Sequence, residues 1–231
     1  MRLIEILMVL SAAIVQNGDL AHDGQALASR HNATHAALGA SLAAMAYNTH
    51  DNWHEELQSE WYINHPSQVT DVYGSSSFNL PAAISLWTAG TLTGQASLQR
   101  LGNGLTRTLI LTQLVVGPIK LVVHRRRPDA SDRFSFPSGH AANVFALARY
   151  VQRDFGTTAS LLPYGLALTT AVGRMEGGRH YLSDVIMGAS FGLIVGSTVH
   201  LPRRTPAEEQ RLQVLPMTNP ATGLRLLLPF R

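Results

Sequence analysis

The sequence predicts an all-α protein, a helical bundle of about six helices. Three observations support this fold class. Apolar residues recur at helical spacing in several stretches, and prolines and glycines separate those stretches. In the last apolar stretch Gly188, Gly192 and Gly196 recur at every fourth position. This spacing lets two helices approach closely, either in a membrane or in a tight bundle.

The N-terminal residues 1–18 predict a secretory signal or an N-terminal anchor. Arg2 precedes an apolar run from Leu3 to Val15, and Glu5 interrupts that run. The run is shorter than the roughly 20 residues that a transmembrane helix needs. An ordinary first helix is therefore the alternative interpretation.

Two segments with different compositions follow. Gly24 to Leu57 is rich in alanine and has helical spacing, whereas Glu55 to Asn79 is polar and aromatic and is predicted to be a loop. Histidine pairs four residues apart, His31/His35 and His50/His54, could ligate a metal on one helical face. No acidic third ligand is spaced to complete such a site. We interpret the pairs as surface or packing histidines and expect no metal site.

The remaining predicted helices follow from apolar runs and their breaks. Gly102-Asn103-Gly104 is expected to break the chain between two helices, Pro128 to end the second, and Gly117-Pro118 to bend it. Pro137 is expected to lie in the first turn of the next helix. The predicted helices are Pro81 to about Gln99, Leu105 to Arg127, Ala141 to Arg153, Thr158 to Val172 and Asp184 to Val199.

The composition favours contact with membranes and with anions. Only 14% of the 231 residues are charged, against about 25% in typical soluble proteins. The net charge of +3 is a mild bias towards anionic partners. There is no cysteine, so neither disulfides nor cysteine-bound metals can contribute. No basic stripe with interleaved aromatic residues is present, so we expect no nucleic-acid partner.

The first motif is a basic segment that ends at Pro128. Lys120 and Arg127 lie seven residues apart, so on one continuous helix both cations would project from the same face. Lys120 is the only lysine in the chain and lies in an apolar stretch, Leu114 to Val123. An unpaired ammonium is costly there, so Lys120 is expected to meet an anion.

The second motif, Pro137-Ser138-Gly139-His140, reads as a helix start. Ser138 and Gly139 would present small side chains and backbone N–H groups at the positive end of the helix dipole, where phosphate is commonly held. His140 follows at once and is close enough to give a proton to a bound anion. A helix start that contains a histidine by chance is the alternative.

The third motif, Gly173 to Asp184, joins two apolar helices. His180 and Asp184 lie four residues apart, so a helix would bring the carboxylate against the imidazole. Asp184 could then fix the tautomer and leave the other ring nitrogen of His180 as a nucleophile. Arg174 adds a planar fork that suits phosphate. A structural His–Asp pair at a helix start is the alternative.

The three motifs together resemble the signature of the PAP2 (type 2 phosphatidic acid phosphatase) superfamily, which also includes bacterial acid phosphatases and vanadium haloperoxidases. The resemblance covers Lys120 to Asp184 and holds for all three motifs in order. One departure is Gly173, where the family usually has serine. The expected organisation is a possible signal or anchor at 1–18, a helical region and loop at 19–80, a catalytic core at 81–200 and a tail at 201–231. The resemblance concerns the core alone.

The resemblance implies a metal-independent phosphatase with a phosphohistidine intermediate and no cofactor. His180 would attack phosphorus, Asp184 would hold its ring, and His140 would protonate the leaving oxygen. The phosphate oxygens would be neutralised by the side chains of Lys120, Arg127, Ser138 and Arg174 and by the N–H of Gly139. Arg179 could bind a second phosphate of a diphosphate substrate, or could simply face solvent.

The expected substrate is a phosphomonoester, with a lipid phosphate or diphosphate favoured. The expected location is the cell envelope, either membrane-associated or periplasmic. The first alternative is a vanadium-dependent haloperoxidase that holds vanadate with the same residues. The second is a non-enzymatic anion- or lipid-binding helical protein that uses the Arg125-Arg126-Arg127 patch.

Overall fold

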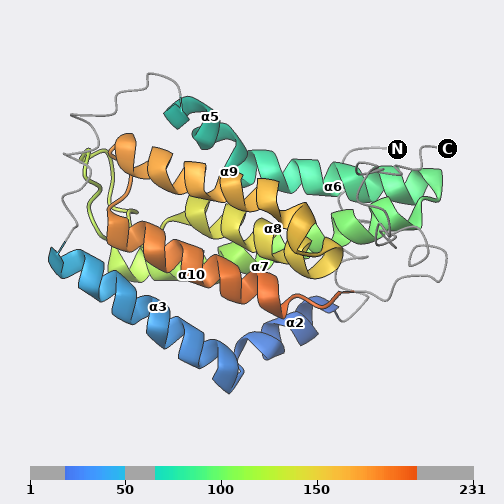
Figure 1. The fold of residues 1–231 in the computed structure, drawn as a ribbon, viewed down its shortest axis with the longest axis horizontal. Helices are drawn as coiled ribbons and strands as arrows, with labels where there is room; N and C mark the ends of the chain where they lie inside the picture. Colours follow the sequence, from blue (N-terminus) through green and yellow to red (C-terminus); the bar gives the residue numbers. More distant parts are fainter. Residues whose placement is uncertain (1–18, 50–65, 202–231) are drawn as a thin grey trace, which may run out of the picture. The chain divides into compact units, whose positions relative to one another are not determined.

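The computed structural model describes residues 19–49 and 66–201, and these ranges are helical without strands (Figure 1). The prediction of an all-α fold is confirmed, with eight helices in the described ranges where about six were expected for the chain. The helices are α2 (Asp19–Leu27), α3 (Arg30–Thr49), α5 (Pro66–Tyr73), α6 (Ser76–Thr93), α7 (Ala96–Val123), α8 (Gly139–Phe155), α9 (Thr157–Glu176) and α10 (Leu182–Thr198).

The N-terminal part of the chain contains more helix breaks, and more helix, than the sequence suggests. The alanine-rich stretch forms two helices, because the chain turns between α2 and α3, where the Ser29 hydroxyl accepts from the backbone N–H of Asn32 at 3.2 Å. The second part of the expected loop forms α5, so that prediction is wrong there. The 1–18 segment, the His50/His54 pair and the tail after residue 201 lie outside the described residues.

The break expected at Gly102-Asn103-Gly104 is absent, because α7 runs through it. A Cβ on Gly102 would lie 2.2 Å from the backbone nitrogen of Trp87, and one on Gly90 would lie 2.2 Å from that of Gln99. These glycines therefore let α6 and α7 pack backbone against backbone. The chain turns instead at Gly94, whose φ of 69° is left-handed and ends α6. Helix α7 also continues through Pro118.

Helices α8 and α10 pack closely along the predicted glycine stripe. Added Cβ atoms on Gly188, Gly192 and Gly196 would lie 2.3, 2.3 and 2.4 Å from the carbonyl oxygens of Ser138, Ala142 and Ala146. Both series advance by four residues, so the two helices stay in contact over two turns. This packing places the start of α8, which carries the second motif, beside the start of α10, which completes the third.

The bundle has polar residues inside and many apolar residues outside. Arg107 on α7 is buried and pairs with buried Asp23 on α2 at 2.8 Å. On the same helix the side chains of Leu121 and Val122 are 70% and 84% exposed. Among the described residues, α7 is the one helix that is long and apolar enough to cross a membrane by these two criteria.

Candidate active site

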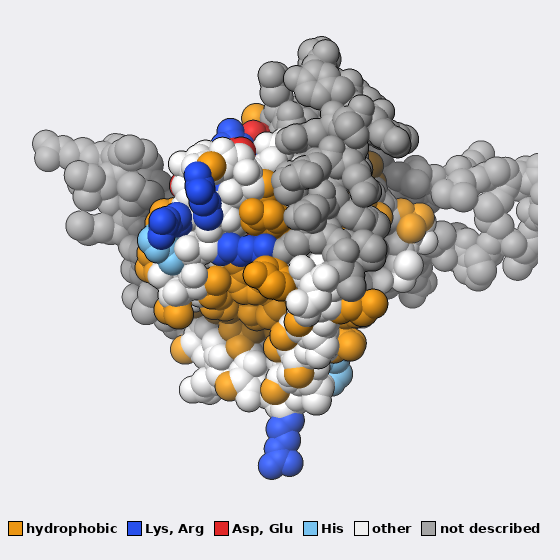
Figure 2. Space-filling view, turned by 90° about the vertical axis from the view of Figure 1, so that its left-hand side faces the viewer, with side chains coloured by type: hydrophobic (Ala, Val, Ile, Leu, Met, Phe, Trp, Pro, Cys, Tyr) orange, Lys and Arg blue, Asp and Glu red, His pale blue; other side chains and the backbone are white. Residues whose placement is uncertain are grey.

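The three motifs meet at one end of the bundle. Helices α7 and α9 end there and α8 and α10 begin there, so the loops between them lie together (Figure 1). Two backbone hydrogen bonds join the motifs: Asp129 N–H donates to the Gly178 carbonyl at 2.9 Å, and Ser138 N–H donates to the Asp184 carbonyl at 2.9 Å. Figure 2 faces this end and shows Lys and Arg side chains near a broad hydrophobic area.

The second motif forms the start of α8 in a way that differs slightly from the prediction. Ser138 is the N-cap, fully buried, and its hydroxyl accepts from the backbone N–H of Ala141 at 3.4 Å. Pro137 therefore precedes the cap and is not part of the first helical turn. The position of an added Cβ on Gly139 lies 3.6 Å from Cε of Lys120, so the lysine side chain extends along the N-terminal end of α8.

Lys120 and Arg127 do not share a helical face, because α7 ends at Val123 rather than at Arg127. His124 adopts a left-handed conformation with φ of 48° and turns the chain away from the helix axis. Arg127 lies in the following loop, where its Nε donates to Asp132 at 2.7 Å and its guanidinium donates to the Arg179 carbonyl at 3.1 Å. The ammonium of Lys120 donates to the Phe134 carbonyl at 2.6 Å.

His180 and Asp184 are both buried and face one another, with 3.7 Å between Nδ1 and the nearer carboxylate oxygen. This distance exceeds a hydrogen bond. The expected helical pairing is wrong in detail, because α10 begins at Leu182 and His180 precedes it. Burial lowers the pKa of His180 to about 4, since the raising effect of Asp184 does not offset desolvation and the nearby charge of Lys120.

The imidazole of His140 lies at the first turn of α8. Its Nε2 is 3.2 Å from the backbone carbonyl of Asp71. A carbonyl can only accept, so Nε2 carries the proton in this arrangement. Burial, followed by the charges of Arg127 and Lys120, lowers the pKa of His140 to about 4. A bound phosphate dianion would offset these cations and favour the protonated ring.

Arg174 and Arg179 have different surroundings in the third motif. Arg174 is buried and forms an ion pair with Asp71 on α5, while its backbone carbonyl accepts from the N–H of His180 at 3.1 Å. Arg179 is half-exposed and pairs with Asp129 at 3.0 Å. In this arrangement Arg179 joins the first and third motif loops, whereas Arg174 extends towards α5.

Three residues that sequence reasoning did not assign to the site contact it directly. Arg125 pairs with Asp184 at 2.8 Å, and the hydroxyl of Ser135 donates to the same carboxylate. Asp71 reaches both Arg174 and His140. Arg125 was visible in the sequence only as part of a basic run. Asp71 lies about 70 residues before His140 in the chain, and no local spacing connects the two.

The departure at Gly173 has a structural counterpart in Thr70. An added Cβ on Gly173 would lie 2.6 Å from the hydroxyl oxygen of Thr70, so this threonine fills the space beside the backbone of α9. A residue with a side chain at position 173 would displace it. Gly173 therefore allows α5 to approach the third motif, and it leaves a hydroxyl from another helix near the position where the family usually has serine.

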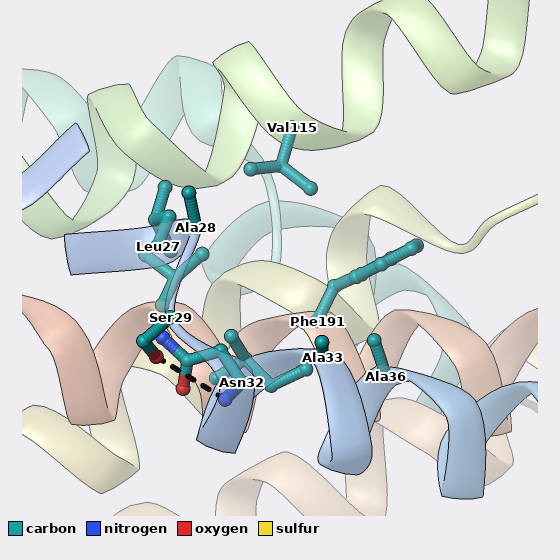
Figure 3. A pocket seen from close by; sticks show the side chains of 10 residues that line it. Leu27, Ala28, Ser29, Asn32, Ala33, Ala36, Val115 and Phe191 are labelled. Atoms are coloured by element: carbon teal, nitrogen blue, oxygen red, sulfur yellow. Dashed lines mark hydrogen bonds between the residues drawn. The ribbon is translucent and has the colours of Figure 1, made fainter. Parts of the chain in front are cut away.

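A cavity of about 200 Å³ lies elsewhere, between the α2–α3 turn and helices α7 and α10. Figure 3 shows that Leu27, Val115 and Phe191 line it, together with Asn32. None of the residues that line this cavity belongs to the three motifs. Among the described residues, no group of three or more histidine or acidic side chains could hold a metal ion.

Parts of the chain are similar in sequence to known phosphatases. It is 39% identical over 75 residues to Lipid A 1-phosphatase of Porphyromonas gingivalis, covering 31% of this chain and 17% of that protein. It is 37% identical over 90 residues to Decaprenylphosphoryl-5-phosphoribose phosphatase of Mycobacterium tuberculosis, covering 35% of this chain and 49% of that protein. The chain thus spans less than half the length of both relatives.

The fold also matches a solved structure. The crystal structure of Aquifex aeolicus LpxE superposes with a TM-score of 0.53 at 19% identity, covering 63% of this chain and 91% of that one. At that identity the likeness concerns the fold alone. The PAP2 superfamily pattern matches residues 103–205, a range that contains all three motifs. Over this segment, which is less than half of the 231 residues, the chain is similar to the PAP2 superfamily.

Proposed function

We propose that the protein is a metal-independent phosphatase that acts on a phosphomonoester, with a lipid phosphate or diphosphate as the substrate class. The observation that carries this proposal is the convergence of His180, His140 and Asp184 with Lys120 and Arg127 at one end of the bundle. A buried imidazole (His180) and a half-buried one (His140) beside fixed cations suit nucleophilic attack on phosphorus and proton transfer to its leaving group.

In the proposed reaction the neutral His180 ring attacks phosphorus and the bond to the leaving oxygen breaks. The protonated His140 ring gives a proton to that oxygen and becomes neutral. A water molecule then loses a proton to His140 and hydrolyses the phosphohistidine, releasing inorganic phosphate. Asp184, held by three donors from Arg125, Ser135 and the Tyr181 backbone, stabilises the charge that develops on His180.

The phosphate oxygens are assigned to the cations and N–H groups around the two histidines. Lys120 and the start of α8, with Ser138 and the Gly139 N–H, form one side of the proposed phosphate site. Arg127 and Arg174 form the other. In this structure these cations have internal acceptors: the Phe134 carbonyl for Lys120, and aspartate carboxylates for the two arginines.

A lipid substrate is favoured by two observations. The names of both curated relatives describe phosphatases of lipid-linked substrates. The exposed apolar side chains of this chain, on α7 and on neighbouring helices, would suit contact with lipid. We therefore infer that the protein acts at a membrane of the cell envelope and that the helix-end site takes the phosphate of a lipid headgroup.

The test compares the full chain with its His180→Ala variant in detergent and excess EDTA. Phosphate release is measured from p-nitrophenyl phosphate and from phosphatidic acid in mixed micelles. We expect chelator-resistant turnover that the substitution abolishes, with faster turnover of the lipid. Turnover that disappears with EDTA and returns with a divalent metal would contradict the metal-free assignment.

If the folded protein releases phosphate from neither substrate, the vanadium-dependent haloperoxidase is tested next. Vanadate, peroxide and bromide added to the same sample would then reveal haloperoxidase activity. Bromide oxidation would replace the phosphatase proposal. Its absence would restrict the proposal to diphosphates, which a polyprenyl diphosphate assay decides directly.

A further inference from the structure

We propose that Asp71 is a resident anion of the phosphate site, whose carboxylate competes with phosphate for Arg174. The competition weakens the binding of substrate and of released phosphate alike. This inference rests on the proposed function, because it takes Arg174 to be a phosphate ligand. It adds a residue from α5, outside all three sequence motifs, that sets the affinity for the phosphate group.

The pairing of these two side chains is the first support. The Arg174 side chain is 5% exposed and the Asp71 side chain 45% exposed, so a buried guanidinium meets a carboxylate that reaches solvent. The Nε of Arg174 is buried without a hydrogen-bond partner in the described ranges 19–49 and 66–201. The guanidinium therefore keeps a donor that its carboxylate partner does not use.

The position of Asp71 is fixed by its neighbours, which is the second support. Its backbone carbonyl accepts from His140, and Thr70 occupies the space beside Gly173. A Cβ on Gly74 would lie 2.9 Å from Cδ2 of His140, so the end of α5 lies directly against the site histidine. The same turn of chain thus contacts the proposed acid and the proposed phosphate ligand.

The chemistry of the two anions explains the competition. Carboxylate and phosphate oxygens both accept from the same planar guanidinium fork. A phosphate dianion that binds Arg174 must displace the carboxylate or lie next to it, and two like charges at close range repel in a partly buried site. Substrate and product share the phosphate group, so Asp71 weakens the binding of both. The rate of the chemical step is therefore affected less than the binding.

The first arm of the test is the binding of inorganic phosphate, measured by calorimetry on the full chain in detergent. For Asp71→Asn we expect a Kd about fivefold or more lower than for the wild type, a shift typical of coupling between two ligands. The KM for p-nitrophenyl phosphate should fall in parallel, with a smaller change in kcat. Glu176→Gln removes the same charge two residues from Arg174 and should leave the Kd within about twofold.

The second arm tests whether the increase in phosphate affinity depends on Arg174. In an Arg174→Gln background, Asp71→Asn should no longer tighten phosphate binding, because the shared guanidinium is absent. Unchanged or weaker phosphate binding by a folded Asp71→Asn protein would overturn the inference and make Asp71 a positioning residue. An equal gain in phosphate affinity from Asp71→Asn in the Arg174→Gln background would overturn the inference as well. Asp71→Ala serves as a second variant if the Asp71→Asn protein does not fold.

This test is separate from that of the proposed function. Phosphate binding is measured without turnover, so a protein that hydrolyses nothing can still show the tightening that Asp71→Asn should cause. Conversely, normal turnover with no change in phosphate binding would remove Asp71 from the site and leave the phosphatase proposal in place.

Discussion

At the scale of single residues, the carboxylate of Asp184 is held from several directions. One terminal nitrogen of Arg125 donates to Asp184 at 2.8 Å and to Ser183 at 2.7 Å. The same guanidinium lies 4.0 Å from the centroid of the Tyr181 ring, a distance that suits a cation–π contact. Arg125 thus connects the loop after α7 with the start of α10, and we infer that it positions Asp184 for His180.

Replacing Arg125 by lysine should lower kcat by about tenfold or more, because the charge-assisted hydrogen bond to Asp184 and the cation–π contact of the guanidinium with Tyr181 are weakened or lost. KM should change less, since Arg125 is not a proposed phosphate ligand. Steady-state kinetics on p-nitrophenyl phosphate measure both. The exposed neighbour Arg126 offers a matched control, and Arg126→Ala should retain kcat. Equal losses in the two variants would rule out the positioning role.

The two histidines predict an acid-side pH optimum. His180 must be neutral to attack, and its pKa of about 4 keeps it neutral through most of the acid range. His140 must be protonated, and its pKa of about 4 in the ligand-free protein makes this form scarcer as pH rises. We therefore expect kcat/KM to be highest below neutral pH and to fall towards pH 8.

The kcat profile should extend to higher pH than the kcat/KM profile, because bound phosphate raises the pKa of His140 and kcat reports the complex. Full pH–rate profiles in constant ionic strength measure both limbs. A kcat/KM that still rises above about pH 9, beyond the range of histidine titration, would exclude this pair of assignments.

At the scale of helices, the contact between α8 and α10 sets the relative position of the second and third motifs. Gly188→Ala should reduce both stability and activity, because its Cβ would lie 2.3 Å from the Ser138 carbonyl and push the two helix starts apart. Thermal unfolding and p-nitrophenyl phosphate turnover measure the effect. Gly165→Ala on α9 is the control, since its Cβ would meet nothing within 4 Å. A Gly188→Ala protein with unchanged stability and turnover would contradict this account of the packing.

Helices with long apolar runs could be predicted from the sequence, whereas the effect of individual glycines could not. The apolar composition of the runs that form α9 and α10 is enough to predict them as helices. Gly102 instead reads as a break, because glycine disfavours an isolated helix. Its actual role depends on Trp87, which is a tertiary contact that no local pattern contains.

Some residues of the candidate site could likewise be predicted from the sequence, and others could not. The contiguous motifs place His140 and His180 in the sequence, so their proximity could be expected from the family resemblance. The partners Asp71 and Arg125 could not be found, because each reaches the site through the approach of separate segments. The predicted common face of Lys120 and Arg127 is wrong for a related reason. The left-handed turn at His124 ends α7 early, and the sequence carries no glycine there to signal it.

At the scale of the whole described bundle, many apolar side chains are exposed and several charged side chains are buried. Arg100 and Arg107 are buried in ion pairs, while leucines of α3, α7 and α9 are exposed. Among the large hydrophobic residues of α9, Leu161 and Leu162 have the largest exposed fractions. Isolated exposed leucines are ordinary, but an apolar exterior over several helices together with buried charges favours a lipid environment.

This pattern predicts that the protein needs detergent or lipid to stay monodisperse. Size-exclusion chromatography with light scattering, on the chain without residues 1–18, measures the state with and without detergent. Flotation with vesicles of anionic and neutral lipids is the companion experiment. A chain that is monodisperse in plain buffer and does not float with vesicles would contradict membrane association.

The buried pair between Arg107 and Asp23 also bears on how the chain is synthesised. The two residues are 84 positions apart, and the carboxylate leaves the ribosome first. A charged arginine makes a segment such as α7 expensive to transfer into lipid by itself. An earlier helix that already presents an aspartate can neutralise that charge during insertion. Under the membrane association proposed above, the order of α2 before α7 would let Asp23 meet Arg107 while the chain is inserted, and we expect a chain expressed without α2 to be retained by the insertion machinery or degraded.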